Sequence, residues 1–373
     1  MENIQPSRVS EKRSFNMILT MCILALQCRL FCDPGFIAAK PPVITCSNGR
    51  FTPSRPATHF CQPAAAVIVT SRGEVELLST NSRCNQKVID FPGLATSGHT
   101  VDLLDSQLLI VGDKDSLGSK WKYLSIKLPR RGLLAVTYYK AAAPVKGRPF
   151  RHTSMVQGNN LYLLGGEKNT RARLETSEWK TFDLRINEES FENFTSSGCI
   201  SRLTKDTFIS MGGIYRQKNK QHIVSSVVKI NITEQTVVKL PQMVHARSFH
   251  SCELLNSTHV IISGGRSHLD DSETNIVPDE LYNTITGHSE VLDTASSLAR
   301  AHHRLIRLEN TVFAIGGMTA DGGKPKAVKT FNTQTRSWES YSELQSHHTG
   351  ELAVTAFPLS SVDCVAGCRC CRV

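Results

Sequence analysis

Short apolar runs recur along the chain, and small or polar residues follow each of them. The stretch from Asn310 to Trp338 shows the full pattern: an apolar run, then Gly316-Gly317, a polar loop, Phe331, and Trp338 seven positions later. A run that is apolar at successive positions indicates a strand buried on both faces. Paired glycines permit positive φ and close approach of another backbone. This stretch therefore predicts short strands that pack closely around a glycine-bearing turn.

Similar stretches occupy most of the chain. Apolar runs lead into four glycine pairs: Gly165-Gly166, Gly212-Gly213, Gly264-Gly265 and Gly316-Gly317. The first glycines of successive pairs are 47 to 52 residues apart. Further upstream, Gly112 lies in the same frame but is followed by Asp113, and an earlier apolar run leads into Ser71-Arg72. The sequence therefore predicts six copies of one unit, of which the first two are degenerate.

A second landmark precedes the apolar run. Four copies carry a histidine at this place, and the fourth copy carries Cys199: the histidines are His99, His152, His250 and His303. A turn residue such as Asn256 or Asn310 then follows, so each copy predicts four short antiparallel strands joined by turns. Because the histidines share one place in the repeat, we expect them to hydrogen-bond the backbone. A ring of metal ligands near a central axis is the alternative.

Repeats of about 50 residues with four short strands are typical of β-propeller blades. An apolar run, a glycine pair, an aromatic residue and a tryptophan seven positions later resemble the kelch repeat. The last copy matches this signature fully, copies three to five keep the glycine pair without the tryptophan, and copies one and two lose the pair as well. The resemblance implies structural roles for the eight paired glycines and for Trp338.

The resemblance also implies the fold: an all-β, six-bladed kelch-type β-propeller over residues 63–358. The sixth copy is followed by one extra apolar segment, Glu351–Pro358, whereas the first copy begins without a leading strand. We therefore expect this C-terminal strand to complete the first blade and to close the ring, which removes exposed sheet edges.

The N-terminus has the composition of a secretory signal. The basic pair Lys12-Arg13 precedes an apolar stretch, Met17–Leu26. A stretch of this length is shorter than the roughly 20 residues that a membrane span needs. We expect residues 1–32 to form a signal peptide and leader; a buried strand or helix is the alternative. Nothing after residue 40 resembles a membrane span.

Several features favour a secreted, extracellular glycoprotein. Cleavage is expected between Gln27 and Ala39, and residues 33–62 then form a cysteine-containing N-terminal extension. Three Asn-x-Thr sequons are possible glycan acceptors on surface loops, and they begin at Asn193, Asn231 and Asn256.

Cysteine usage agrees with export. The chain has 12 cysteines, and cysteines in secreted chains usually pair. The candidates for disulfides are Cys46, Cys61, Cys199, Cys252, Cys364, Cys368, Cys370 and Cys371. The last four form a cysteine-rich tail, residues 359–373, for which disulfides to the rest of the protein are expected and a metal knot is the alternative. Cys199 and Cys252 occupy similar places in neighbouring copies, which fits either a bridge between blades or buried free thiols.

The charge balance favours acidic partners. The formal net charge is +10, and a basic balance attracts anionic glycans or acidic protein surfaces. Basic clusters lie at predicted loops, namely residues 127–132, 146–151 and 215–221. They are either contact points for such a partner or a solvated surface. Nucleic acid is not an expected partner for an exported chain.

The sequence lacks the usual signatures of catalysis. It contains no Gly-x-Ser-x-Gly elbow, no phosphate loop and no His-Glu-x-x-His motif, so no catalytic residue, metal or cofactor is predicted. Because kelch propellers usually serve as binding platforms, the resemblance implies a non-catalytic module for protein–protein or protein–glycan interaction through the propeller loops. One alternative is an extracellular enzyme of copper-oxidase or glycan-processing type with an active site on the propeller axis. Another is an intracellular kelch adaptor, if the leader is misread.

Overall fold

The structure is a computed structural model, and all regular elements among its described residues are β-strands. It describes residues 27–29, 36–38, 43–47, 50–53, 61–78, 85–90, 97–104, 107–113, 122–127, 151–166, 170–175, 178–186, 189–190, 194–217, 220–269, 276–293, 297–347 and 349–358. The cysteine-rich tail lies outside these residues, and so does the predicted signal peptide and leader except for the short strand β1 (Gln27–Arg29).

Six sheets form the body, antiparallel except for one short parallel pair at the edge of the fourth, and we number them in chain order. Sheet 1 contains β31 (Leu352–Pro358), β5 (Cys61–Thr70), β6 (Glu74–Leu78) and β7 (Asn85–Asp90). Sheet 2 has three strands, β8 (Ser97–Leu104), β9 (Gln107–Asp113) and β10 (Lys122–Lys127). Sheet 3 contains β11 (His152–Gln157), β12 (Asn160–Gly165), β13 (Thr170–Glu175) and β14 (Glu178–Thr181).

The C-terminal half repeats the same arrangement. Sheet 4 contains β17 (Cys199–Arg202), β18 (Thr207–Met211), β21 (Val227–Asn231) and β22 (Thr236–Leu240), extended at its edge by β15 (Arg185–Ile186) and β16 (Glu189–Ser190). Sheet 5 contains β23 (Ser251–Leu254), β24 (His259–Ser263), β25 (Glu280–Asn283) and β26 (Ser289–Val291). Sheet 6 contains β27 (Arg304–Leu308), β28 (Thr311–Ile315), β29 (Ala327–Asn332) and β30 (Ser337–Glu343).

Three smaller pairings complete the described strands. β1 pairs with β3 (Val43–Ser47), which pairs with β4 (Arg50–Pro53). β19 (Ile214–Gln217) and β20 (Lys220–Ile223) form a hairpin that projects from sheet 4. β2 (Phe36–Ala38) pairs with the first residues of β5, while β31 pairs with the rest of β5, from Ala64 to Thr70.

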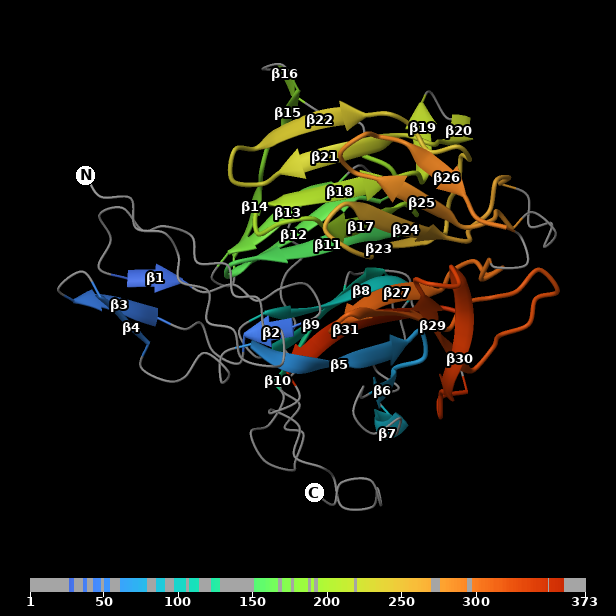
Figure 1. Ribbon diagram of the computed structural model, residues 1–373, viewed down its shortest axis with the longest axis horizontal. Helices are drawn as coiled ribbons and strands as arrows, with labels where there is room; N and C mark the ends of the chain where they lie inside the picture. The colour runs from blue at the N-terminus through green and yellow to red at the C-terminus, as the bar shows by residue number, and fades with distance from the viewer. Residues whose placement is uncertain are drawn as a thin grey trace.

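Five of the six sheets have four strands or more, and they are arranged as the blades of a β-propeller. The innermost strands contact one another in the order β8, β11, β17, β23, β27 and β31, and β31 in turn contacts β8. Figure 1 shows these strands facing one another across the middle of the molecule, with the outer strands of each sheet farther away.

The core lies between neighbouring sheets. The second strand of sheet 5 is buried on both faces, because Val260, Ile261 and Ile262 are all inaccessible to solvent. Val260 and Ile262 pack with Ile209 and Met211 of sheet 4 in one apolar cluster. Such a side chain stabilises the fold by about 1.5–3 kcal/mol when fully buried. The uninterrupted apolar runs in the sequence therefore correspond to strands packed between two neighbours, as expected.

The body has two different ends. At one end lie the glycine pairs, the connections from second to third strands, and the connections from each fourth strand to the next sheet. We call it the Gly-Gly end; the β19–β20 hairpin marks it on the right of Figure 1. The opposite end, here called the turn end, carries the short turns between first and second strands and between third and fourth strands, such as that joining β21 to β22.

Candidate functional site

The glycine pairs allow successive sheets to approach closely. All eight paired glycines have positive φ, from 57° at Gly264 to 103° at Gly213. A Cβ atom on Gly264 would lie 1.8 Å from the carbonyl oxygen of Arg300, in the connection to sheet 6. The neighbouring Gly265 nitrogen donates to that same oxygen at 2.9 Å. A side chain at Gly264 would therefore displace the backbone of the adjoining sheet.

Six equivalent residues, one at or just before the start of each innermost strand, form what we call the axial ring. They are Gly98, Arg151, Ser197, Phe249, His302 and Glu351. The first five have φ between 56° and 59°. The nitrogens of Arg151, Ser197, Phe249 and His302 donate, respectively, to the carbonyl oxygens of Gly98, Arg151, Ser197 and Phe249, at 2.8 to 3.3 Å. The Gly98 nitrogen donates to Oε1 of Glu351 at 2.9 Å, which adds Glu351 to this chain of bonds.

Three side chains of the axial ring stack. The rings of Phe249 and His302 are nearly parallel, with centroids 4.2 Å apart. The guanidinium carbon of Arg151 lies 4.6 Å from the Phe249 ring centroid, within the range of a cation–π contact. These three residues and Glu351 are half-buried. Together they place a cation, an aromatic surface and a carboxylate at the centre of the Gly-Gly end.

Burial and nearby cations keep His302 neutral. Burial is the larger cause and lowers the pKa of His302 to about 4; Glu351 opposes this effect, and Arg266, Arg151 and Arg304 add to it. Burial also lowers the pKa of Arg304, which Glu351 partly offsets. At neutral pH, the positive charge at this centre therefore comes from arginine rather than from histidine.

The four repeated histidines are all buried, and most of them contact the preceding sheet. Nε2 of His99 donates to the Val69 carbonyl at 3.0 Å, and Nε2 of His250 donates to the Met211 carbonyl at 3.1 Å. These two confirm the expected bond to the backbone. His152 instead lies 2.9 Å from the Thr100 hydroxyl, and neither ring nitrogen of His303 has a hydrogen-bond partner among the described residues.

The register of sheet 4 shows that Cys199 does not occupy the histidine position of the repeat, contrary to the expectation from the sequence. Each repeated histidine of sheets 3, 5 and 6 lies opposite, or next in register to, the first glycine of its pair. In sheet 4 that place belongs to Gly198, because Cys199 pairs with Met211, one residue before Gly212. Cys199 is therefore one residue beyond the histidine position. A Cβ atom on Gly198 would lie 2.9 Å from the Gly212 carbonyl oxygen, so little space remains there for a side chain.

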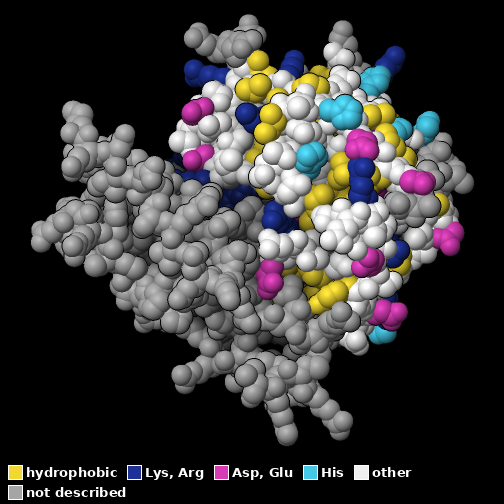
Figure 2. Space-filling model, in the orientation of Figure 1, with side chains coloured by type: hydrophobic (Ala, Val, Ile, Leu, Met, Phe, Trp, Pro, Cys, Tyr) yellow, Lys and Arg dark blue, Asp and Glu magenta, His cyan; other side chains and the backbone are white. Residues whose placement is uncertain are grey.

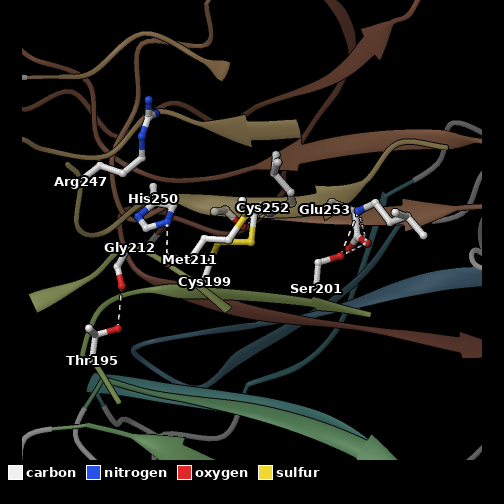
Figure 3. The surroundings of a disulfide bond; sticks show 12 residues. Thr195, Cys199, Ser201, Met211, Gly212, Arg247, His250, Cys252 and Glu253 are labelled. Atoms are coloured by element: carbon white, nitrogen blue, oxygen red, sulfur yellow. Dashed lines mark hydrogen bonds between the residues drawn. A yellow bond between two sulfur atoms is a disulfide. The ribbon is translucent and has the colours of Figure 1, made fainter. Parts of the chain in front are cut away.

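A disulfide joins the inner strands of sheets 4 and 5. Cys199 on β17 and Cys252 on β23 have Cα atoms 5.7 Å apart and are bonded to each other (Figure 3). Beside them, the Ser201 hydroxyl donates to Glu253 at 3.2 Å and accepts the Leu254 backbone N–H at 3.0 Å. Of the two possibilities left open by the sequence, the bridge between sheets is the one observed.

Buried acids on third strands hold the connections at the Gly-Gly end, and the sequence alone did not reveal them. Glu280 accepts the backbone N–H groups of Val244 and His245 at 2.9 and 3.0 Å and pairs with buried Arg247. Glu76 accepts the N–H groups of residues 345 and 346 in the same way, at 2.8 and 3.0 Å. A single acid within a strand lacks the regular spacing that marks a motif, which explains why these positions were missed.

The tryptophan of the repeat has a defined role. Nε1 of Trp338 donates to Oδ2 of buried Asp279 at 2.7 Å, and its ring packs edge-on against Phe331, with centroids 5.2 Å apart. Asp279 also accepts the backbone N–H groups of Gly264 and Leu298, at 2.8 and 3.1 Å. Trp338 therefore links sheet 6 to the glycine turn of sheet 5.

The remaining candidate residues are dispersed. Asn231 and Asn256 lie in turns at the turn end, where each caps its own turn through Oδ1. Asn193 and Cys364, Cys368, Cys370 and Cys371 lie outside the described residues. Cys46 and Cys61 lie on β3 and β5, and their side chains are outside the description. The three basic clusters lie in different places. The first begins at Lys127, the last residue of β10, and the second ends at Arg151, which belongs to the axial ring. The third lies in the β19–β20 hairpin.

Within the part of the chain that the structure describes, no group of three or more His, Cys, Asp or Glu residues is placed to hold a metal ion. The same residues include no helix long and apolar enough to cross a membrane.

Comparison with known proteins supports the fold. The chain is similar to the solved structure titled "Structure of YjhT", with a TM-score of 0.55 and 14% sequence identity, over 76% of this chain and 99% of that one. No family model matches the sequence, and no curated protein matches it. At this identity, the likeness establishes a β-propeller fold alone.

Proposed function

We propose that the chain is a secreted, non-catalytic binding module: a six-bladed kelch-type β-propeller that binds another extracellular protein or glycan through loops at its Gly-Gly end. The observation that carries this proposal is the stack of Arg151, Phe249 and His302 beside Glu351, in the axial ring. Half-buried aromatic and arginine side chains are the groups that most often anchor a partner. Here they lie where the connections from several sheets converge.

Two observations support six blades and a closed ring. The innermost strands of all six sheets contact one another in sequence, including β31 with β8. β31 also pairs with β5 over seven residues, from Leu352 opposite Thr70 to Pro358 opposite Ala64. The kelch assignment rests on the repeat pattern, on the positive φ of the glycine pairs, and on the bond between Trp338 and Asp279.

Export is supported by the disulfide and the sequons. Structural disulfides persist in oxidising compartments and are rare in the cytosol. The bond between Cys199 and Cys252 therefore favours the extracellular reading over an intracellular adaptor. Asn256 lies in an exposed turn and Asn231 ends β21 at a turn, and surface turns are where sequons accept glycans.

The binding role is tested with protein purified from the medium of secreting cells and applied to living cells, with bound protein measured by flow cytometry. Arg151→Ala is expected to reduce binding by about tenfold, because it removes an anchor at the centre of the site. Lys205→Ala, at the turn end, is the control and should bind as the parent does. Melting curves of both variants check that they remain folded.

Equal binding by folded Arg151→Ala, or no binding by the parent protein to any cell type, would contradict the proposal. A stoichiometric copper ion in the purified protein, with oxidation of a sugar alcohol, would instead favour the enzyme alternative.

A further inference from the structure

The two ends of the propeller differ in charge. Exposed basic residues lie in several connections of the Gly-Gly end, namely Arg72, Lys220 and Lys324, with half-buried Arg266 and Lys326 beside them. The acidic side chains beside them include Asp293, Asp321, Glu343 and Glu351, together with buried Glu74, Asp279 and Glu280. Arg151, Arg216, Arg247 and Arg300 add to the positive charge of this end. At the turn end, the described turns carry Lys205 and Arg336 against Asp206, Glu234 and Glu309. The Gly-Gly end is therefore the basic end, although Figure 2 shows charges of both signs interspersed over the side of the molecule.

Histidines are also concentrated at the Gly-Gly end. His222, His245, His268 and His347 lie in four different connections there. Figure 2 shows histidine side chains gathered at the upper right, over the β19–β20 hairpin and the neighbouring strands of sheet 5. Each imidazole adds to the basic surface a ring nitrogen that can donate or accept a hydrogen bond.

The groups facing these histidines differ. Nδ1 of His245 contacts Glu280 at 2.9 Å, and Arg247 pairs with the same carboxylate. Nδ1 of His347 lies 3.4 Å from Nζ of Lys326, and its backbone N–H donates to Glu74.

The other two histidines have more open surroundings. His268 contacts the Ser267 hydroxyl at 2.9 Å. His222 lies opposite Tyr215 in the hairpin, with Lys220 and Arg216 on the same two strands. His222 and His268 are exposed, so they are the two that a partner can contact most directly.

Apolar side chains complete this surface. Val244 and Leu269 are 56% and 47% exposed, and they lie in two connections that the Ser248–Arg266 bridge joins. The described sequon residues, Asn231 and Asn256, are both at the opposite end. Glycans at those two positions would leave the Gly-Gly end uncovered.

We infer that the Gly-Gly end is a docking surface for an acidic protein segment that also carries apolar residues. The inference rests on the proposed binding function and adds the chemistry of the partner. Charge complementarity selects an acidic partner. Val244, Leu269 and Phe249 favour a protein, because a sulfated polysaccharide has no apolar side chains to place against them.

The probe is a fluorescent synthetic peptide of repeated Glu-Glu-Leu units, with a Glu-Glu-Ser peptide and a heparin oligosaccharide as comparisons. Fluorescence anisotropy is recorded at about pH 7.4, where the glutamates are ionised because their ordinary pKa is about 4.3. We expect the Glu-Glu-Leu peptide to bind about threefold or more tightly than either comparison.

Two variants locate the surface. Lys220→Glu with Lys324→Glu should weaken peptide binding by about tenfold. Lys205→Glu with Arg336→Glu makes the same change in net charge at the turn end and should leave binding unchanged.

Three results would overturn the inference: heparin binding without peptide binding, equal affinity for the Glu-Glu-Leu and Glu-Glu-Ser peptides, or equal loss in the two charge-reversal variants. The proposed function is tested separately from this inference. If the secreted protein still binds cells through Arg151 while Lys220→Glu with Lys324→Glu has no effect on peptide or cell binding, the module binds a partner but this assignment is wrong.

Discussion

Two arginines at equivalent positions in sheets 5 and 6 have neighbours of opposite charge sign: one lies beside an acid and the other beside a lysine. Buried Arg247 pairs with Glu280, which lies opposite Ile262, two residues before the glycine pair. Buried Arg300 bonds the carbonyl oxygens of Gly316 and Ala327. In sheet 6 the position equivalent to Glu280 is Lys329, opposite Ala314. Burial and then Arg300 lower the pKa of Lys329, so this position places a cation beside a cation.

Lys329→Glu is therefore expected to stabilise the protein. The change replaces like-charge repulsion with an ion pair to Arg300, and we expect a gain of about 1 kcal/mol in the free energy of unfolding. Urea denaturation at neutral pH measures it. Lys329→Gln removes the repulsion without forming the pair and should give a smaller gain. A loss of stability in Lys329→Glu would show that Arg300 does not reach this position.

His250 predicts how stability responds to acid. Burial, followed by Arg247, lowers its folded-state pKa to about 3, from an ordinary value of 6.5. Between these two pH values, His250 therefore binds a proton in the unfolded chain but not in the folded chain. The contribution of His250 is complete above about pH 6.5 and is lost as the pH falls toward 3, by up to about 1.4 kcal/mol per pH unit.

Comparing His250→Gln with the parent isolates this effect from other titrating groups. Asp102 acts in the opposite direction: burial raises its pKa to about 6, so it favours the folded state in acid. Urea denaturation at about pH 7 and about pH 5 should show a smaller acid loss in the variant. An identical loss in both proteins would mean that His250 is not kept neutral by the fold.

At the scale of strands and turns, the sequence predicted those elements that carry the same side-chain types in each repeat. Glycine pairs and apolar runs located the second strand of most sheets, and Glu351–Pro358 was expected as an additional strand. The axial ring could not be predicted in this way. Its members, which include Gly98, Ser197 and Phe249, share a backbone conformation rather than a side chain. Only their register in the folded sheets aligns them.

The same limit explains the misplacement of Cys199. Gly198 occupies the histidine position without any side chain to identify it, so the adjacent cysteine appeared to be the equivalent residue. The buried acids Glu76 and Glu280 were missed because their partners are backbone N–H groups of a different repeat. Long-range contacts with the main chain leave no pattern in the local sequence.

The disulfide should contribute to stability at this scale, because it joins two inner strands whose cysteines are 53 residues apart in sequence. A loop of that length corresponds to about 4 kcal/mol of stabilisation in the chain-entropy treatment. Cys199→Ala with Cys252→Ala should lower the free energy of unfolding by about that amount, measured by urea denaturation. Two free thiols at these positions in the folded parent protein, found by alkylation and peptide mapping, would refute the bond.

At the scale of the whole molecule, the β-propeller has two unlike ends. The turn end carries the described sequon residues, and the Gly-Gly end carries the axial ring, a basic surface and most of the exposed histidines described in connections. Such a division suits a protein that meets its partner with one face while the other face carries glycans. The division has this meaning only if the chain is exported.

The measurement that tests this most directly is expression in a secreting eukaryotic cell, with medium and lysate blotted before and after N-glycosidase treatment. The account predicts protein in the medium that loses mass on treatment, with Asn231→Gln and Asn256→Gln each removing part of that loss. Protein retained in the cytosol at full mass would contradict export and the proposed extracellular partner, and it would favour the intracellular adaptor.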